Sequence, residues 1–216
     1  FIWKDAENIP TTQFYRVAFN PHNPNFYLGG AQDNGTTGGN INNINAWERI
    51  RGGDGFQPAF YKNNDQIWFA ETQRGNIYYS ENAGFNWSNA DDGLNSNRHW
   101  DMQYIISPHD DNVLYTATDQ VYTASNGLPE YWYPISDTIV DFDRDAFIHQ
   151  ATSIDQSELN KNILYVGTSD GLVWRTLDEG QSWEHLINNL PDRYVSSIKA
   201  SPNVEGNAYV TFSGYR

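Results

Sequence analysis

Tryptophan residues that each close a short polar loop recur along this chain at a nearly constant interval. Their separations are 40, 45 and 51 residues for Trp47, Trp87, Trp132 and Trp183. A second marker is an aromatic residue that lies once per repeat in a short apolar run directly after a turn. Its separations are 41, 47, 50 and 44 residues for Tyr27, Trp68, Tyr115, Tyr165 and Tyr209. Two independent markers with one period of about 40 to 50 residues indicate an internal repeat.

Each repeat contains short runs of β-branched, aliphatic and aromatic residues, bounded by Gly, Asn and Pro. Such runs are typical of strands joined by tight turns. Runs 75–80 and 171–176 each begin with the glycine of a turn. A polar loop that ends in Trp then leads into a further strand. Four strands in about 45 residues make one propeller blade. The sequence therefore predicts an all-β fold, a β-propeller of four-stranded antiparallel blades. The one expected helical patch covers 144–150.

The repeat predicts one domain, a propeller fragment that covers 1–216. Blade units are expected at roughly 12–50, 51–92, 98–137, 147–190 and, in part, 194–216, as the period divides the chain. Trp3 looks like the tail of an earlier blade. About four full units leave the ring incomplete, and a propeller protects its edge strands by closing. We therefore expect the rest of the propeller to come from the same or another chain.

The charge and composition of the chain limit the kinds of ligand and partner that it can bind. The formal net charge is -14, so we expect no nucleic-acid ligand and no anionic membrane surface. No apolar run is long enough to cross a bilayer, so no membrane insertion is expected. The absence of Cys excludes disulfides and thiolate metal sites. The five His residues show no paired metal-ligand spacing, so no metal-hydrolase site is predicted. A neutral glycan or a protein partner fits these limits.

Two of the polar loops share the pattern Ser/Thr-x-Asp/Asn-x-Gly-x-x-Trp. The matching residues are Ser80, Asn82, Gly84 and Trp87 in one loop and Thr176, Asp178, Gly180 and Trp183 in the other. The Asp or Asn side chain is expected to bond nearby backbone N–H groups, and the Gly to supply a positive φ. The Trp covers the turn with an apolar face. We interpret these residues as structural, and a degenerate copy occupies 123–132.

This motif resembles the Asp-box, or BNR repeat, of sialidase-like, sortilin-like and family-74 glycoside-hydrolase-like (xyloglucanase-like) propellers. Stretches 27–36, 47–56 and 209–216 are also similar to large secreted Bacteroidetes-type proteins that carry a type IX secretion sorting domain. That resemblance implies a secreted or cell-surface, extracellular location, although 1–5 show no signal-peptide pattern. A sialidase would need an early Arg-Ile-Pro strand, and Arg16 is followed by Val-Ala instead.

Asp33 and Asp54 are the candidate catalytic residues. Asp33 follows an expected strand in a Gly-rich loop, and the family-74 resemblance implies a catalytic Asp at a similar place. Asp54 is the candidate second carboxylate, since glycosidases use two, about 5 Å or roughly 6.5–9.5 Å apart. The resemblance also allows the second carboxylate to come from a further propeller. The alternative is that both residues belong to turns, because Asp-Gly and Asn-Gly are common hairpin signals.

The aromatic run Tyr131, Trp132 and Tyr133 is a candidate substrate-binding surface. Flat aromatic faces stack on sugar rings, which would make the run part of a glycan site. The alternative is a strand whose aromatic residues pack between blades.

Asp141, Asp143 and Asp145 present alternating carboxylates, as a calcium-binding loop does. An EF-hand loop would need Gly and Glu where this sequence has Ala146 and Thr152. A solvated acidic loop is therefore the alternative, and calcium is the only cofactor that the sequence suggests.

Two functions from different classes fit the sequence. The first is a secreted or cell-surface propeller that binds a glycan or a protein, or assists assembly, without catalysis. The second, an enzyme, is a family-74-like endo-glycoside hydrolase acting on a neutral β-glucan such as xyloglucan.

Overall fold

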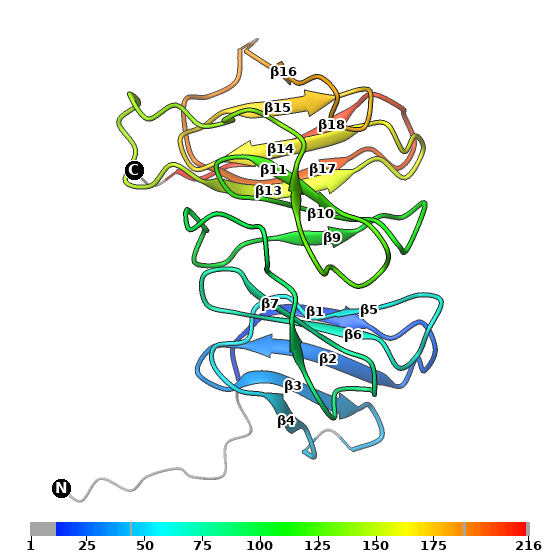
Figure 1. Cartoon of the computed structure of the whole chain (residues 1–216). Helices are drawn as coiled ribbons and strands as arrows, with labels where there is room; N and C mark the ends of the chain where they lie inside the picture. The colour runs from blue at the N-terminus through cyan, green and yellow to red at the C-terminus, as the bar shows by residue number, and fades with distance from the viewer. Residues whose placement is uncertain (1–11, 44, 188, 215–216) are drawn as a thin grey trace, which may run out of the picture.

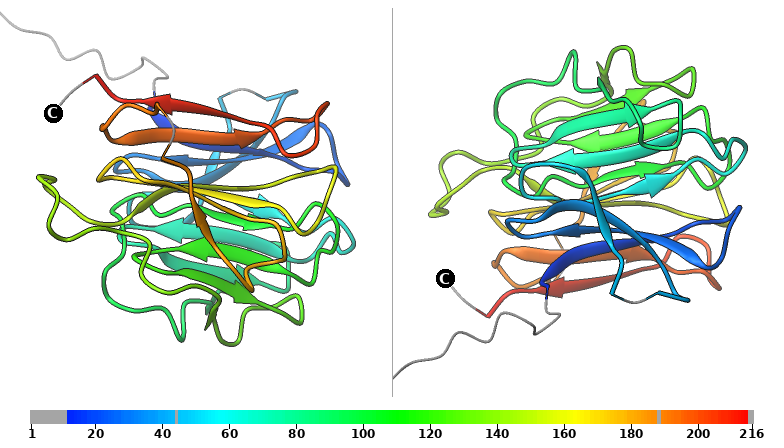
Figure 2. Two further views of the ribbon diagram at one scale, coloured as in Figure 1. Left: turned by 90° about the horizontal axis from the view of Figure 1, so that it is seen from above. Right: turned by 90° about the horizontal axis from the view of Figure 1, so that it is seen from below.

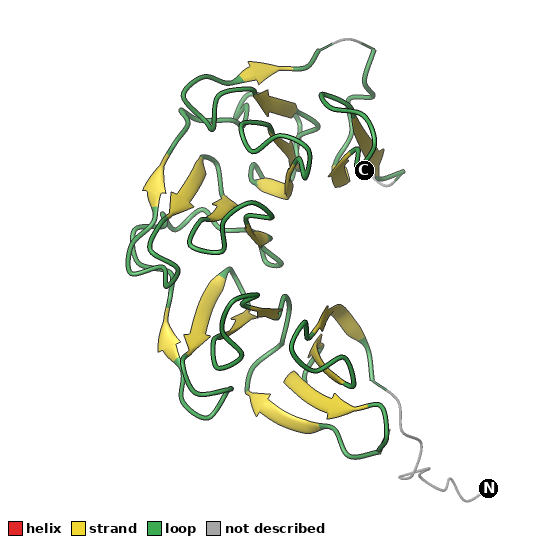
Figure 3. Ribbon diagram, turned by 90° about the vertical axis from the view of Figure 1, so that its right-hand side faces the viewer, coloured by secondary structure: helices red, strands yellow, loops and turns green. Residues whose placement is uncertain are grey.

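The computed structural model describes residues 12–43, 45–187 and 189–214, which form strands, turns and loops. Five antiparallel sheets follow one another along the chain and stand side by side in an open arc (Figure 1, Figure 3). Four sheets have four strands each, and the last has two. The prediction of an all-β propeller with an incomplete ring is confirmed. Trp3 lies outside the described residues.

Within each sheet, strands that are neighbours in sequence are also neighbours in space. The first sheet contains β1 (Phe14–Phe19), β2 (Phe26–Ala31), β3 (Gly35–Asn40) and β4 (Glu48–Arg51). The second contains β5 (Ala59–Phe60), β6 (Trp68–Thr72), β7 (Asn76–Ser80) and β8 (Ser88–Asn89). The third contains β9 (Tyr104–Ile106), β10 (Leu114–Ala117), β11 (Val121–Ala124) and β12 (Tyr133–Pro134). The fourth contains β13 (Ala151–Gln156), β14 (Leu164–Thr168), β15 (Val173–Thr176) and β16 (Glu184–His185), and the fifth contains β17 (Val195–Ala200) and β18 (Ala208–Phe212).

The two sequence markers occupy equivalent places in successive sheets. The periodic Trp directly precedes the fourth strand of each complete sheet. The second aromatic marker lies in the second strand of all five sheets. The period therefore measures the distance from one sheet to the next.

The apolar core lies between the sheets. One cluster joins Phe69 and Ile77 of the second sheet to Tyr104 and Leu114 of the third. The other clusters join the first sheet to the second, the third to the fourth, and the fourth to the fifth. Because an amphipathic sheet must cover its apolar faces, each sheet packs on the next, as two further views show (Figure 2).

One sheet face at the end of the arc is uncovered. Val17 and Phe19 on β1 are exposed, while Ala18 between them packs against the cluster shared with the second sheet. An uncovered apolar face of this kind is consistent with an incomplete ring. It stays a prediction that the rest of the ring comes from the same or another chain.

Because successive strands in each sheet run in opposite directions, the loops lie on two opposite faces of the arc. One face, here called the connector face, holds the turns between second and third strands and the connections between sheets. It comprises 32–34, 52–58, 73–75, 90–103, 118–120, 135–150, 169–172, 186–187 and 189–194. The opposite face, here called the turn face, holds the remaining loops, including 81–87 and 177–183.

The two Ser/Thr-x-Asp/Asn loops form the same hydrogen-bonded turn on the turn face. The Thr176 hydroxyl accepts from the Gly180 amide at 2.9 Å, and the Asp178 carboxylate accepts from the Ser182 amide at 2.8 Å. In the other loop, Ser80 and Asn82 accept from Gly84 and Asn86 at the same two distances. Hydrogen bonds from Ser182, then Thr176, lower the pKa of Asp178. These contacts engage the Asp178 carboxylate within its own turn.

Thr176→Val is expected to destabilise the protein by about 2 kcal/mol, because it removes the acceptor of the buried Gly180 amide and the donor to Asp178. Thr176→Ser keeps the hydroxyl and should retain most of the stability. Urea denaturation of the three proteins measures the difference. Equal losses in both variants would show that packing, rather than the hydroxyl, stabilises the turn.

The expected helix at 144–150 is wrong. Its backbone bonds to the turn between β14 and β15 in place of a helical ladder: the Gln150 amide donates to the Ser169 hydroxyl at 3.0 Å, and that hydroxyl donates to the Ile148 carbonyl at 2.7 Å. Tertiary bonds through the Ser169 hydroxyl thus replace the local bonds that a helix would need. Within the described residues there is no helix, and hence none that is long and apolar enough to cross a membrane.

Candidate functional site

The structure brings Asp33 and Asp54 together on the connector face. Asp33 lies in the turn between β2 and β3, with a φ of 60 degrees, and Asp54 lies in the connection from β4 to β5. The Asp33 amide donates to the Asp54 carboxylate at 2.8 Å. A parallel bridge between Gly35 and Asp54 fixes the same contact. The Asp54 carboxylate therefore lies against the backbone of Asp33, and a catalytic role for the pair stays a prediction.

Close backbone packing holds this pair in place. The Gly55 amide donates to the Ala31 carbonyl at 3.0 Å. A Cβ at Gly55 would lie 2.3 Å from the Gly35 carbonyl oxygen, and a Cβ at Gly30 would lie 2.0 Å from the Phe56 carbonyl oxygen. Only glycine allows the connection to approach the β2–β3 turn this closely. The Gly-rich sequence around Asp33 and Asp54 thus holds the turn that contains Asp33 against the segment that contains Asp54.

The aromatic run at 131–133 does not join this pair. Trp132 is fully buried, and its indole N–H donates to the Ala90 carbonyl at 2.7 Å. The prediction that Trp132 contacts a ligand is therefore wrong, because the ring fills the space between the second and third sheets. Tyr133 in β12 and Tyr131, two residues before it, are exposed, with ring centroids 4.9 Å apart. Their role in ligand binding stays a prediction.

The acidic loop at 141–145 bonds partly within itself and partly to the turn between β14 and β15. The Asp141 carboxylate accepts from the Asp143 amide at 3.1 Å, and the Asp141 amide donates to Asp170 at 2.6 Å. Among the described residues, no three His, Cys, Asp or Glu side chains are grouped as a metal site. Calcium binding by Asp141, Asp143 and Asp145 stays a prediction.

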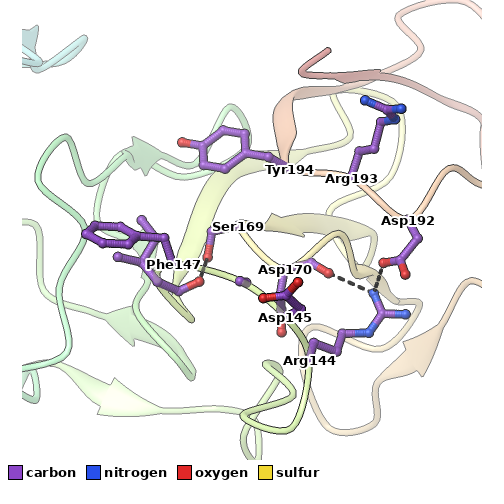
Figure 4. Close-up of a pocket in the computed structure, with 10 residues that line it drawn as sticks. Arg144, Asp145, Phe147, Ser169, Asp170, Asp192, Arg193 and Tyr194 are labelled. Atoms are coloured by element: carbon purple, nitrogen blue, oxygen red, sulfur yellow. Dashed lines mark hydrogen bonds and ion pairs between the residues drawn. The ribbon is translucent and has the colours of Figure 1, made fainter. Parts of the chain in front are cut away.

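An open pocket of about 780 Å³ lies on the connector face, between the connections that precede β13 and β17. Phe147 and Tyr194 form one side, and the Phe147 side chain is fully exposed (Figure 4). Arg144 and Asp192 lie on the other side, with Ser169 and Asp170 from the β14–β15 turn between them. The pocket therefore combines aromatic faces with charged hydrogen-bonding groups.

Ion pairs and hydrogen bonds order the charged side of this pocket. Arg144 donates to the Asp192 carboxylate at 2.6 Å and to the Asp170 carbonyl at 2.7 Å (Figure 4). The Asp170 carboxylate is buried and has His149 Nδ1 at 3.7 Å. Three connector-face segments are thus joined, so the pocket has a defined shape before any ligand enters.

A second polar cluster joins β1 to the connections that precede β9 and β17. Arg16 of β1 forms an ion pair with Asp101, 85 residues away in sequence. His99 Nε2 lies 3.2 Å from the Tyr194 hydroxyl, so this cluster reaches the pocket. Burial lowers the pKa of His99, which keeps the imidazole neutral at pH 7. Trp100, between His99 and Asp101, is about half exposed at 47%.

Sequence reasoning missed both the pocket and this cluster. Their residues come from three or more sheets, and no local spacing relates Arg16 to Asp101 or Phe147 to Tyr194. The one local signal is the placement of Phe147 and Trp100 as large aromatic residues in long polar connections. A large aromatic side chain that is exposed beside a pocket is a candidate contact for a ligand or a partner.

No protein-family model matches the chain, and no curated protein matches it. Solved structures do match. The GH74 xyloglucanase from Xanthomonas campestris is 14% identical with a TM-score of 0.71, covering 91% of this chain and 35% of the enzyme. An ancestral GH74 enzyme is 19% identical with a TM-score of 0.72, covering 94% and 30%.

A component of the Mitotic Checkpoint Complex is also similar, at 10% identity and a TM-score of 0.65, covering 97% of this chain and 60% of that one. At such identities the likeness shows a shared β-propeller fold alone. The chain spans about a third of the length of the two GH74 enzymes.

Proposed function

We propose that the protein is a secreted or cell-surface propeller that binds a neutral β-glucan such as xyloglucan in the pocket on its connector face. The fully exposed Phe147 ring at the rim of that pocket carries the proposal. A sugar ring presents apolar C–H groups on its faces and hydroxyls on its edge. It can therefore stack on Phe147 and exchange hydrogen bonds with the charged side of the pocket.

The net charge favours a neutral ligand. At -14, the protein repels polyanions such as pectin or nucleic acid. Within the pocket, Arg144 is paired with Asp192, and Arg193 donates to the Gly214 carbonyl. A neutral glucan avoids the repulsion that the net charge imposes on an anionic ligand. The resemblance to extracellular glycan-active propellers supports a secreted or cell-surface location.

Phe147→Ala is expected to weaken xyloglucan binding about tenfold, because it removes one stacking face from an exposed position. Phe85→Ala is the matched control, since Phe85 is 85% exposed but lies on the turn face. Calorimetry with xyloglucan oligosaccharides, and with pectin fragments as an anionic comparison, measures the effect. Equal affinities for the two variants, or no binding by the parent protein, would overturn the proposal.

The contact between Asp33 and Asp54 favours a second candidate, an endo-glycoside hydrolase. In this candidate one carboxyl would protonate the leaving oxygen, and the other would activate water or attack the sugar. We expect Asp33→Asn to reduce reducing-sugar release from xyloglucan at least about 100-fold. Asp65→Asn, an exposed change on the turn face, serves as the control. No release by the unmodified protein would remove this candidate and leave the binding proposal standing.

A further inference from the structure

Two of the periodic tryptophans make the same hydrogen bond to the sheet that precedes their own. The Trp132 indole N–H donates to the Ala90 carbonyl at 2.7 Å, and the Trp183 indole N–H donates to the Ile135 carbonyl at 2.8 Å. Each of these carbonyls directly follows a fourth strand, β8 or β12. Trp87 makes no such bond, and the sheet before it has a register shift between β3 and β4.

The Leu186 carbonyl is the next one in this series. Leu186 directly follows β16, the fourth strand of the fourth sheet. Its amide donates to the Val173 carbonyl at 2.8 Å, and the equivalent amides of the second and third sheets donate to Ile77 and Val121 at the same distance. The backbone therefore holds the three carbonyls in equivalent places. Within the described residues the fifth sheet has only β17 and β18, so it has no fourth-strand tryptophan to reach Leu186.

An open pocket of about 600 Å³ lies at this place, between the fourth and fifth sheets. Its lining includes Tyr165, Val173 and Leu186. The equivalent residues of the third sheet share one apolar cluster with Trp174 and Trp183 of the fourth sheet; they are Tyr115, Val121 and Ile135. The pocket therefore has the lining of an inter-sheet tryptophan site.

An unpaired edge of the fifth sheet lies beside this pocket. β18 pairs with β17, and in the part of the chain that the structure describes no strand pairs with its other edge. Ala208 and Val210 of β18 line the pocket, as do Ile187 and Leu190, which are exposed. An unpaired strand edge next to an apolar site favours the addition of a further strand.

We propose that the pocket and the free edge of β18 form a docking site for a tryptophan-bearing β-hairpin of the chain's own repeat type. The first strand of the hairpin pairs antiparallel with β18. The Trp that opens its second strand enters the pocket and donates its indole N–H to the Leu186 carbonyl. The hairpin thereby completes a four-stranded fifth sheet.

The hairpin does not come from the folded part of a second copy of this chain. Among the strands that the structure describes, each hairpin of this type is already paired within its own sheet, as β3–β4, β7–β8, β11–β12 and β15–β16 are. Removing one of them would expose the apolar cluster that it covers, so the exchange would gain nothing. The occupant is therefore a separate hairpin.

The test appends a second copy of 171–187 to the C-terminus of the chain through a short Gly-Ser linker. This copy contains the third and fourth strands of the fourth sheet with both of their tryptophans. The linker holds it at an effective concentration of roughly millimolar. Hydrogen–deuterium exchange in 208–212 should become at least about tenfold slower than in the unextended protein. Exchange in β4, an outer strand of the first sheet, should not change.

Nuclear magnetic resonance of the indole N–H groups supplies a second measurement. The Trp183 indole of the appended copy should exchange with water as slowly as the indole of Trp132, because both donate to a carbonyl between two sheets. Trp183→Ala within the appended copy should abolish the protection of 208–212. Gln181→Ala within the appended copy, at an exposed position, should retain it.

Unchanged exchange in 208–212, a freely exchanging indole in the appended copy, or protection that survives Trp183→Ala would overturn the inference. Concentration-dependent protection of 208–212 in the unextended protein would also overturn it, because a second copy would then occupy the site. This pocket shares no lining residue with the pocket on the connector face. A protein that binds no glycan but protects 208–212 as described would defeat the proposed function and not this inference.

Discussion

Trp132→Ala is expected to destabilise the fold by about 3–5 kcal/mol, a large part of the stability of a typical domain. The ring is fully buried between the second and third sheets, among Ile77, Leu94 and Tyr122. Its loss leaves a cavity that two separate sheets cannot readily collapse around, and leaves the Ala90 carbonyl without its donor. Chemical denaturation followed by circular dichroism measures the change.

The neighbouring tyrosine supplies the control. Tyr133→Ala changes a ring that is 58% exposed and should alter stability by less than about 1 kcal/mol. A Trp132→Ala protein as stable as Tyr133→Ala would contradict the position of Trp132 between two sheets. Because the two residues are adjacent in sequence, the contrast reports on the fold rather than on local composition.

Gly55→Ala is expected to cost about 3 kcal/mol, because the added methyl would overlap the backbone of the adjoining segment. The new Cβ would lie 2.3 Å from the Gly35 carbonyl oxygen and 2.7 Å from the Thr36 amide nitrogen, and neither atom belongs to a flexible side chain. The connection must move away from the β2–β3 turn, which also separates Asp54 from Asp33. Thermal denaturation and the Asp33 amide signal measure the two effects.

Gly52→Ala is the matched control, three residues away in the same glycine-rich stretch. An added Cβ there meets nothing within 4 Å, so the variant should behave like the unmodified protein. Equal destabilisation by the two changes would mean that chain flexibility, and not close packing, explains the glycines around Asp54.

The blade repeat could be predicted from the sequence because it depends on local patterns. Trp47, Trp87, Trp132 and Trp183 mark the start of fourth strands, since a bulky apolar ring must cover each polar turn. The Asx-type turns at Asn82 and Asp178 are equally local, each closing within five residues. The expected helix at 144–150 failed because the β14–β15 turn, some 20 residues away, supplies the bonds of that segment.

The candidate site could be predicted only in part. Asp33 and Asp54 are 21 residues apart and meet because one glycine-rich connection returns to the turn of its own sheet. Arg16 of β1 and Asp101 of the connection that precedes β9 are 85 residues apart, and no sequence spacing relates them. Trp132 and Tyr133 look alike in sequence, yet one is buried and the other exposed. Which side of a short outer strand faces the neighbouring sheet depends on a register that the sequence alone does not define.

The most direct test of the proposed glycan-binding face is hydrogen–deuterium exchange with and without a saturating xyloglucan oligosaccharide. We predict slower exchange in 144–148, 169–170 and 192–194, which line the pocket on the connector face. Segments 81–87 and 177–183 on the turn face should exchange at unchanged rates. Protection confined to the turn face, or no protection anywhere at saturation, would contradict the account.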